Sequence, residues 1–114
     1  AYNANPSSMA AALENFNTMA ADSKIVILGD MFELGEQTAE EHQSLIDLVI
    51  SFDFSAAYFV GAHFSDCETS KTKADFFKTT ASFCKVLKAK EIKDSLILIK
   101  GSRGMALETL VDCI

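Results

Sequence analysis

Residues 24–29 read KIVILG, an apolar run rich in β-branched side chains that ends in glycine. A strand with one exposed face alternates apolar and polar residues, whereas a near-continuous apolar run is typical of a strand buried on both faces of a parallel sheet. Two further runs have this character: AAYFV at residues 56–60, followed by Gly61, and SLILI at residues 95–99, followed by KGSRG. We therefore predict a mainly parallel sheet.

Helical patterns lie between these strands. Asn5 and Pro6 make a good helix start, and the apolar residues after them recur along one helical stripe. A capping box at Thr38 to Glu41 predicts a second helix, which we expect to run to about Phe52. Weaker patterns predict the remaining elements: a short helix at residues 62–67, a short strand at residues 74–78, a helix capped by Thr80 and a last helix from Met105.

The alternation of strands and helices is typical of βαβ units with right-handed crossovers. It predicts an α/β protein with a Rossmann-like, three-layer α/β/α arrangement around a mainly parallel sheet. No repeat, linker or low-complexity tract divides the sequence, so we expect a single domain over residues 1–114. An asparagine-rich opening turn without an initiator Met indicates a piece of a longer protein.

The composition argues against a disordered, a membrane-spanning or a nucleic-acid-binding protein. The chain has 114 residues, 49% of them hydrophobic, and this apolar content excludes intrinsic disorder. No apolar stretch approaches the ~20 residues of a membrane span, so we expect none. The formal net charge is −6, although lysines gather after Lys71. Because these lysines fall at helix-surface spacing or flank strands, we interpret them as a solvated face and expect no nucleic-acid partner.

The three cysteines, Cys67, Cys84 and Cys113, are widely spaced and form no CxxC pair. An odd number of dispersed cysteines in an apolar chain favours free thiols in a reducing compartment over a disulfide framework. His42 and His63 show no ligand-like spacing to them. We therefore predict three free thiols and no metal site.

Ligands of open parallel α/β sheets bind beyond the carboxyl ends of the strands. This rule selects residues 29–35, 61–63 and 100–104. In the last segment the glycines allow close backbone approach, Ser102 can cap a helix, and Arg103 offers a planar fork to a carboxylate or phosphate. An ordinary turn with a solvated arginine fits the spacing equally well.

Asp30 and Glu33 place two carboxylates within one turn after the first strand. They can hold an ammonium group, take a proton or support Mg²⁺, but Gly-Asp also favours a turn by itself, and spacing alone favours that reading. His42 lies in the first turn of the second helix, where a histidine is more often structural than catalytic. The sequence lacks GxxxxGK[ST], GxGxxG and GxSxG, so it has no P-loop, dinucleotide fingerprint or nucleophile elbow of its own.

Three motifs together resemble the C-terminal domain of the Mur ligases. They are YNANPSSM at residues 2–9, ILGDMFELG at residues 27–35 and IKGSRGM at residues 99–105. They occur in the family's order, and Glu41-His42 after the second motif also fits. The resemblance covers the chain almost from end to end, and only residues 62–78 look idiosyncratic.

The resemblance implies a three-domain, ATP-dependent amide ligase of cytoplasmic peptidoglycan synthesis. Within the family, the chain most resembles the member that joins D-alanyl-D-alanine to UDP-N-acetylmuramoyl-tripeptide through an acyl phosphate. The chain would be the third domain, with ATP and Mg²⁺ bound mainly by a central domain that carries the P-loop. We therefore expect the isolated chain to be inactive, and its partners to be these two substrates and its own central domain.

The resemblance and the residue chemistry together imply three groups of site residues. Those expected to bind the dipeptide are Asp30, Glu33, Lys100, Ser102 and Arg103; those at the nucleotide edge are Tyr2, Asn3 and Asn5; those behind the site are Met31 and His42. A sister ligase, either another Mur ligase or one of the folylpolyglutamate synthase type, would share the fold but not the first two motifs together. A receiver-like interaction module would need a phosphoacceptor aspartate after a middle strand, where GAH stands at residues 61–63.

Overall fold

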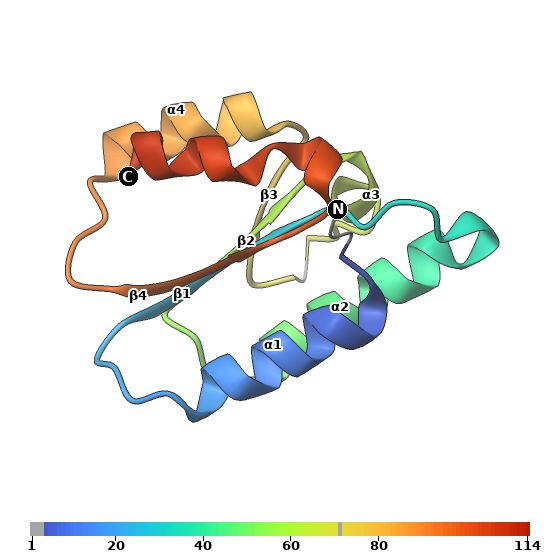
Figure 1. Ribbon diagram of the computed structural model, residues 1–114, viewed down its shortest axis with the longest axis horizontal. Helices are drawn as coiled ribbons and strands as arrows, with labels where there is room; N and C mark the ends of the chain where they lie inside the picture. The colour runs from blue at the N-terminus through green and yellow to red at the C-terminus, as the bar shows by residue number, and fades with distance from the viewer. Residues whose placement is uncertain (1–3, 71) are drawn as a thin grey trace.

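The computed structural model describes residues 4–70 and 72–114. Within these residues the sheet has four strands, all parallel, in the order β3-β2-β1-β4 (Figure 1). The strands are β1 (Lys24–Gly29), β2 (Ala56–Val60), β3 (Asp75–Phe77) and β4 (Leu96–Lys100). The parallel sheet predicted from the apolar runs is thus confirmed.

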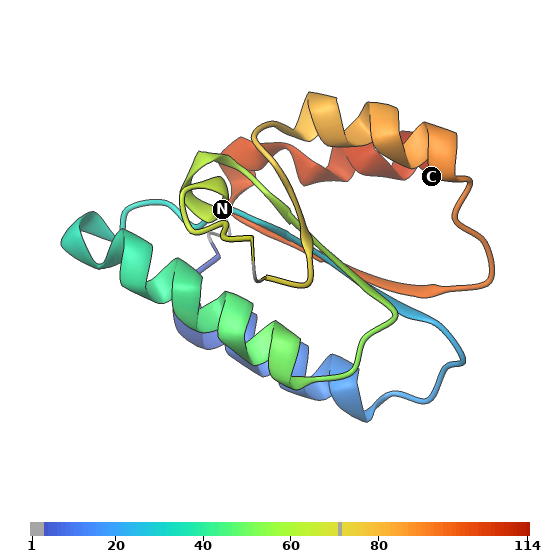
Figure 2. The same cartoon turned by 180° about the vertical axis from the view of Figure 1, so that it is seen from behind.

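Helices cover both faces of this sheet (Figures 1 and 2). On one face lie α1 (Pro6–Thr18) and α2 (Thr38–Ser51), and on the other lie α4 (Thr80–Lys90) and the 3-10 helix η3 (Leu107–Cys113). Shorter elements belong to the connections: η1 (Gly35–Gln37), α3 (Ala62–Ser65) and η2 (Arg103–Met105). The three layers confirm the Rossmann-like prediction. Among the described residues, no helix has the length and apolar character needed to cross a bilayer.

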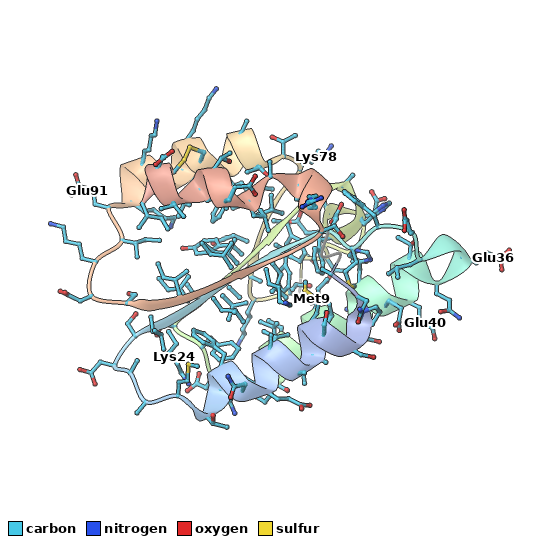
Figure 3. The ribbon with its side chains drawn as sticks, viewed as in Figure 1. Met9, Lys24, Glu36, Glu40, Lys78 and Glu91 are labelled. Carbon is cyan, nitrogen blue, oxygen red and sulfur yellow. A yellow bond between two sulfur atoms is a disulfide. The ribbon has the colours of Figure 1, made fainter. Side chains whose placement is uncertain are left out.

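The core has one half on each face of the sheet. Val26 and Leu28 of β1 pack with α1 and α2, whereas Ile25 and Ile27 pack with α4 and η3. The side chain of Met9, in α1, is buried against the sheet, whereas Glu36 projects outward from η1 (Figure 3). Because both faces of β1 are buried, its sequence shows no alternation of apolar and polar residues.

Helix starts agree with the sequence in one case and differ in two. Asn5 caps α1 with its side chain, as predicted. The capping box predicted at Thr38 does not form, because η1 runs directly into α2 and Thr38 already has helical backbone angles. Its hydroxyl donates instead to the carbonyl of Gly35 at 2.8 Å. Thr79, rather than Thr80, caps α4.

The last strand is more exposed than predicted. The run at residues 95–99 was expected to be buried on both faces, but β4 pairs only with β1 among the described strands and forms an edge of the sheet. Leu96 is 38% exposed, and the other residues of the strand are half-buried. Both faces of β4 still pack against the core, through Leu98 on one side and Ile97 and Ile99 on the other, so the predicted double burial is present but incomplete.

The cysteines also differ from the prediction. Cys84 on α4 and Cys113 on η3 form a disulfide with their Cα atoms 5.4 Å apart, and Cys67 is free. The prediction of three free thiols is therefore wrong. The paired cysteines are 29 positions apart, and the packing of α4 beside η3 on one face of the sheet brings them together (Figure 1).

Candidate functional site

The carboxyl ends of the parallel strands meet at one edge of the sheet, where ligands are expected. Backbone hydrogen bonds join the strand ends there. The amide of Asp30, after β1, donates to the carbonyl of Val60 in β2 at 3.1 Å. The amide of Ser102, after β4, donates to the carbonyl of Asp30 at 3.0 Å. The three segments selected from the sequence are thus adjacent in space.

The Asp30 side chain is enclosed rather than open to solvent. It is 2% exposed, and its two carboxylate oxygens accept the backbone N–H groups of His63 at 2.9 Å and Phe64 at 3.0 Å. Gly61 lies so close to this carboxylate that a Cβ there would collide with it, and its φ is 128°. Asp30 therefore fastens α3 to the end of β1, and its oxygens are engaged by backbone rather than by a ligand.

His42 has no exposed surface and connects α2 to the loop after β1. Its Nδ1 lies 2.6 Å from the carbonyl oxygen of Thr38, and its Nε2 accepts the backbone N–H of Met31 at 3.0 Å. Since a carbonyl only accepts and an amide only donates, the proton is on Nδ1 and the imidazole is neutral. Burial lowers the pKa of His42 below its ordinary value of 6.5, although Thr38 and Asp30 act in the opposite direction.

Ser102 joins the loops after β1 and β4. It is buried, and its hydroxyl oxygen accepts the backbone N–H of Phe32 at 3.0 Å. The backbones of the two strand ends are in close contact beneath it, because a Cβ on Gly101 would lie 2.8 Å from the Cα of Gly29. Ser102 is therefore a structural part of the junction, and Gly101 allows the close approach that the sequence suggested.

Two charged residues of the site are exposed at its rim. Glu33 has left-handed backbone angles, with φ at 65°, and Arg103 begins η2 directly after Ser102. Arg103 and the neighbouring Lys100 help to line an open hollow of about 340 Å³ along the end of β4. The rim thus offers carboxylate and guanidinium groups to a ligand. Beneath it lies a buried layer formed by Asp30, His42 and Ser102.

The expected nucleotide edge is described only in part. Asn5 uses its side chain to cap α1, accepting the N–H of Ser8 at 2.9 Å. Tyr2 and Asn3 lie outside the described residues. No group of three or more His, Cys, Asp or Glu side chains within residues 4–70 and 72–114 has a geometry that could hold a metal ion.

The loop after β2 was selected from the sequence, but the roles of its individual residues were not predicted. Gly61 makes room for the Asp30 carboxylate, and its position directly after a strand was the available signal. The His63 ring packs edge-on against Phe32, with ring centroids 6.2 Å apart. Phe32 in turn covers Gly104, where a Cβ would lie 2.7 Å from its ring. The rim therefore has an aromatic side, formed by Phe32 of the second motif and His63 of the loop after β2.

Comparison with known proteins gives consistent similarities. The family model described as Mur ligase, glutamate ligase domain, matches residues 1–103. The UDP-N-acetylmuramoyl-tripeptide–D-alanyl-D-alanine ligase of Rickettsia prowazekii is 37% identical over 97% of this chain, and that of Treponema pallidum is 38% identical over 96%. Each match covers 25% of the relative, so the chain spans about a quarter of the length of these proteins.

Solved structures of MurF ligases contain a domain with the fold of this chain. A crystal structure of MurF from Acinetobacter baumannii has a TM-score of 0.80 and 29% identity, covering 97% of this chain and 25% of that one. The MurF ligase from Thermotoga maritima in complex with ADP has a TM-score of 0.76 at 24% identity, covering 98% of this chain and 26% of that one. This second likeness concerns the fold.

Proposed function

Since the chain belongs to the Mur ligase family, we propose that residues 1–114 form the C-terminal domain of a UDP-N-acetylmuramoyl-tripeptide–D-alanyl-D-alanine ligase. The observation that carries this proposal is the similarity to two ligases of that name along almost the whole chain. Because the chain spans a quarter of those relatives, the sites for the UDP-sugar and the ATP phosphates are assigned to the other domains of the protein. The enzyme is assigned to peptidoglycan synthesis in the cytoplasm.

In the proposed reaction, the tripeptide carboxylate attacks the γ-phosphorus of ATP, giving an acyl phosphate and ADP. The amine of D-alanyl-D-alanine then attacks the acyl carbon, and the tetrahedral intermediate collapses to the amide with release of phosphate and a proton. The part of this chain is to bring the dipeptide to the acyl phosphate, since holding two reactants together lowers the barrier by several kcal/mol in favourable cases. The isolated chain is therefore expected to form no amide.

The rim of the candidate site suits a zwitterionic dipeptide. Arg103 and Lys100 offer positive charge to its carboxylate, with the N–H groups of the glycine-containing turn beside them. Glu33 is assigned to the ammonium group, because it is exposed, whereas both oxygens of Asp30 are engaged by backbone. Asp30 and Ser102 support the rim from beneath in this proposal.

The nucleotide is assigned to the side of Tyr2, Asn3 and Asn5, as the resemblance of residues 2–9 to the family implies. Mg²⁺ is assigned to the central domain that carries the P-loop, as the resemblance to the Mur ligases implies. A receiver-like module is disfavoured, because Asp30 is buried and its oxygens accept two backbone N–H groups.

The test is Arg103→Ala in the full-length enzyme. A charge-assisted hydrogen bond to a carboxylate contributes about 1.5–3 kcal/mol, so the KM for the dipeptide should rise about ten- to a hundredfold. The KM for ATP should stay unchanged, Arg103→Lys should restore binding only in part, and Lys88→Ala on the exposed surface of α4 should have no effect. An effect on ATP alone would reverse the assignment of the two loops, and no effect would show Arg103 to be a solvated turn residue.

A further inference from the structure

His42 is buried in the base of the site and has no surface that a substrate can reach. Its two ring nitrogens bind backbone groups of two different segments, the Thr38 carbonyl in α2 and the Met31 amide in the loop after β1. Met31 is itself fully buried, so its N–H depends on the imidazole as a partner. His42 is thus placed to control the conformation of the loop that carries Phe32 and Glu33.

We propose that His42 is a positioning residue that holds the loop after β1 only while its imidazole is neutral, so that acidification releases this loop and weakens dipeptide binding. His42 holds the loop through hydrogen bonds within this chain, whereas the effect on dipeptide binding rests on the proposed function.

Protonation would reverse the chemistry of one hydrogen bond. Neutral Nε2 accepts the N–H of Met31 at 3.0 Å, but protonated Nε2 is a donor and would face another donor. The Asp30 carboxylate lies close by, with Oδ1 3.9 Å from Nε2, and it offers the new N–H an acceptor. The imidazolium would therefore exchange the Met31 amide for Asp30, leaving a buried N–H without its partner.

The titratable groups around His42 act in both directions. Asp30 after β1 and Glu41 in α2 favour the charged form, whereas His63 in α3, whose ring centroid is 5.3 Å away, opposes it. Burial is the strongest influence, and it holds the pKa of His42 below 6.5. The imidazole is therefore neutral near pH 7, and the exchange of partners occurs on the acidic side of 6.5.

Two of the side chains proposed to bind the dipeptide, Glu33 and Arg103, depend on this loop. Glu33 follows Met31 by two residues and has strained, left-handed backbone angles, so a shift of Met31 alters where its carboxylate lies. The next amide, that of Phe32, is bound to Ser102, the residue before Arg103. A change at His42 therefore reaches both sides of the rim through two consecutive amides.

Nuclear magnetic resonance of the 114-residue chain tests the loop directly. At neutral pH, long-range ¹H–¹⁵N spectra should show the His42 proton on Nδ1 and none on Nε2. On acidification, His42 should titrate below 6.5, and the amides of Met31 and Phe32 should shift with the same midpoint. A proton on Nε2, a midpoint at or above 6.5, or a Met31 amide that does not follow His42 would each overturn the proposal.

Two variants separate positioning from simple packing. His42→Gln keeps an acceptor for Met31 but cannot titrate. In this variant, the chemical shifts of the Met31 and Phe32 amides should therefore not change on acidification. The control is His63→Gln, which removes a repulsive neighbour and should move the midpoint upward without abolishing the transition. A transition that persists in His42→Gln would assign it to another group and refute the proposal.

Kinetics of the full-length enzyme test the link to the substrate. The KM for the dipeptide should rise several-fold between neutral and mildly acidic pH, more than kcat falls, and this rise should be absent in His42→Gln. An identical rise in His42→Gln would refute the link. If the amides titrate as expected but the full-length enzyme does not use D-alanyl-D-alanine, the proposed function fails while the role of His42 in the loop stands.

Discussion

Asp30→Asn should strongly destabilise this chain, because it alters a buried carboxylate that fastens one strand end to the next. Both oxygens of Asp30 accept backbone N–H groups at the start of α3, from His63 at 2.9 Å and Phe64 at 3.0 Å. An asparagine of the same shape has only one acceptor oxygen, and its NH₂ group would face the second N–H.

The magnitude follows from these two contacts. Hydrogen bonds to a charged group contribute about 1.5–3 kcal/mol each, so the carboxylate supplies about 3–6 kcal/mol in total. Asparagine keeps one neutral hydrogen bond, worth about 1 kcal/mol. The expected loss in the free energy of unfolding is the difference, about 2–5 kcal/mol, which is a large part of the stability of a typical domain.

Urea unfolding of the 114-residue chain, followed by circular dichroism at neutral pH, measures this loss. The matched control is Asp47→Asn, the same chemical change on the exposed side of α2, where Asp47 accepts a hydrogen bond from Gln43 at 2.9 Å. Such an exposed helix pair contributes about 0.2–0.5 kcal/mol, so the control should stay near the wild type. If Asp30→Asn changed stability no more than Asp47→Asn, the anchoring role of Asp30 would be refuted.

Two further predictions concern the backbone and the cysteines. Gly35→Ala meets open space and should cost only the left-handed penalty of about 1–2 kcal/mol, whereas Gly61→Ala also collides with Asp30 and should cost more; the reverse order in urea unfolding would contradict the packing around Gly61. Thiol titration of the denatured chain should find one thiol before reduction and three after it, and three at the outset would contradict the disulfide. In the native chain, burial and Asp66 raise the pKa of Cys67, so its alkylation should be slow near pH 7.

The sequence predicted the parts of the fold that local patterns determine. Strand β1 is the clearest case, because an unbroken apolar run with a terminal glycine reports burial on both faces without reference to distant residues. The cap of α1 by Asn5 is equally local. Once the strands are parallel, their carboxyl ends must share an edge, so the adjacency of the three loops also followed from the sequence.

Other features depended on residues far apart in the chain. The Asp30 carboxylate is occupied because α3, more than thirty residues later, presents its amides to it, as the separation of 33 positions to His63 shows. The disulfide needed α4 and η3 to lie side by side, and the exposure of β4 needed the strand order. The absent capping box at Thr38 had a local cause, but η1 carried no clear signal in the sequence.

Some charged groups at the strand ends are buried and others are exposed. Because of this difference, effects on stability and effects on dipeptide binding can be measured separately. Asp30 is 2% exposed and bound to backbone, so its substitution changes the free energy of unfolding before any ligand is present. Glu33 and Arg103 are exposed, and substitution of their charged groups should change stability by no more than about 0.5 kcal/mol. Stability and dipeptide binding measured for the same variants should therefore sort Asp30 from Arg103. An Arg103→Ala variant that unfolded as easily as Asp30→Asn would mean that the guanidinium supports the junction itself, and its loss of binding could then no longer be read as a lost contact with the dipeptide.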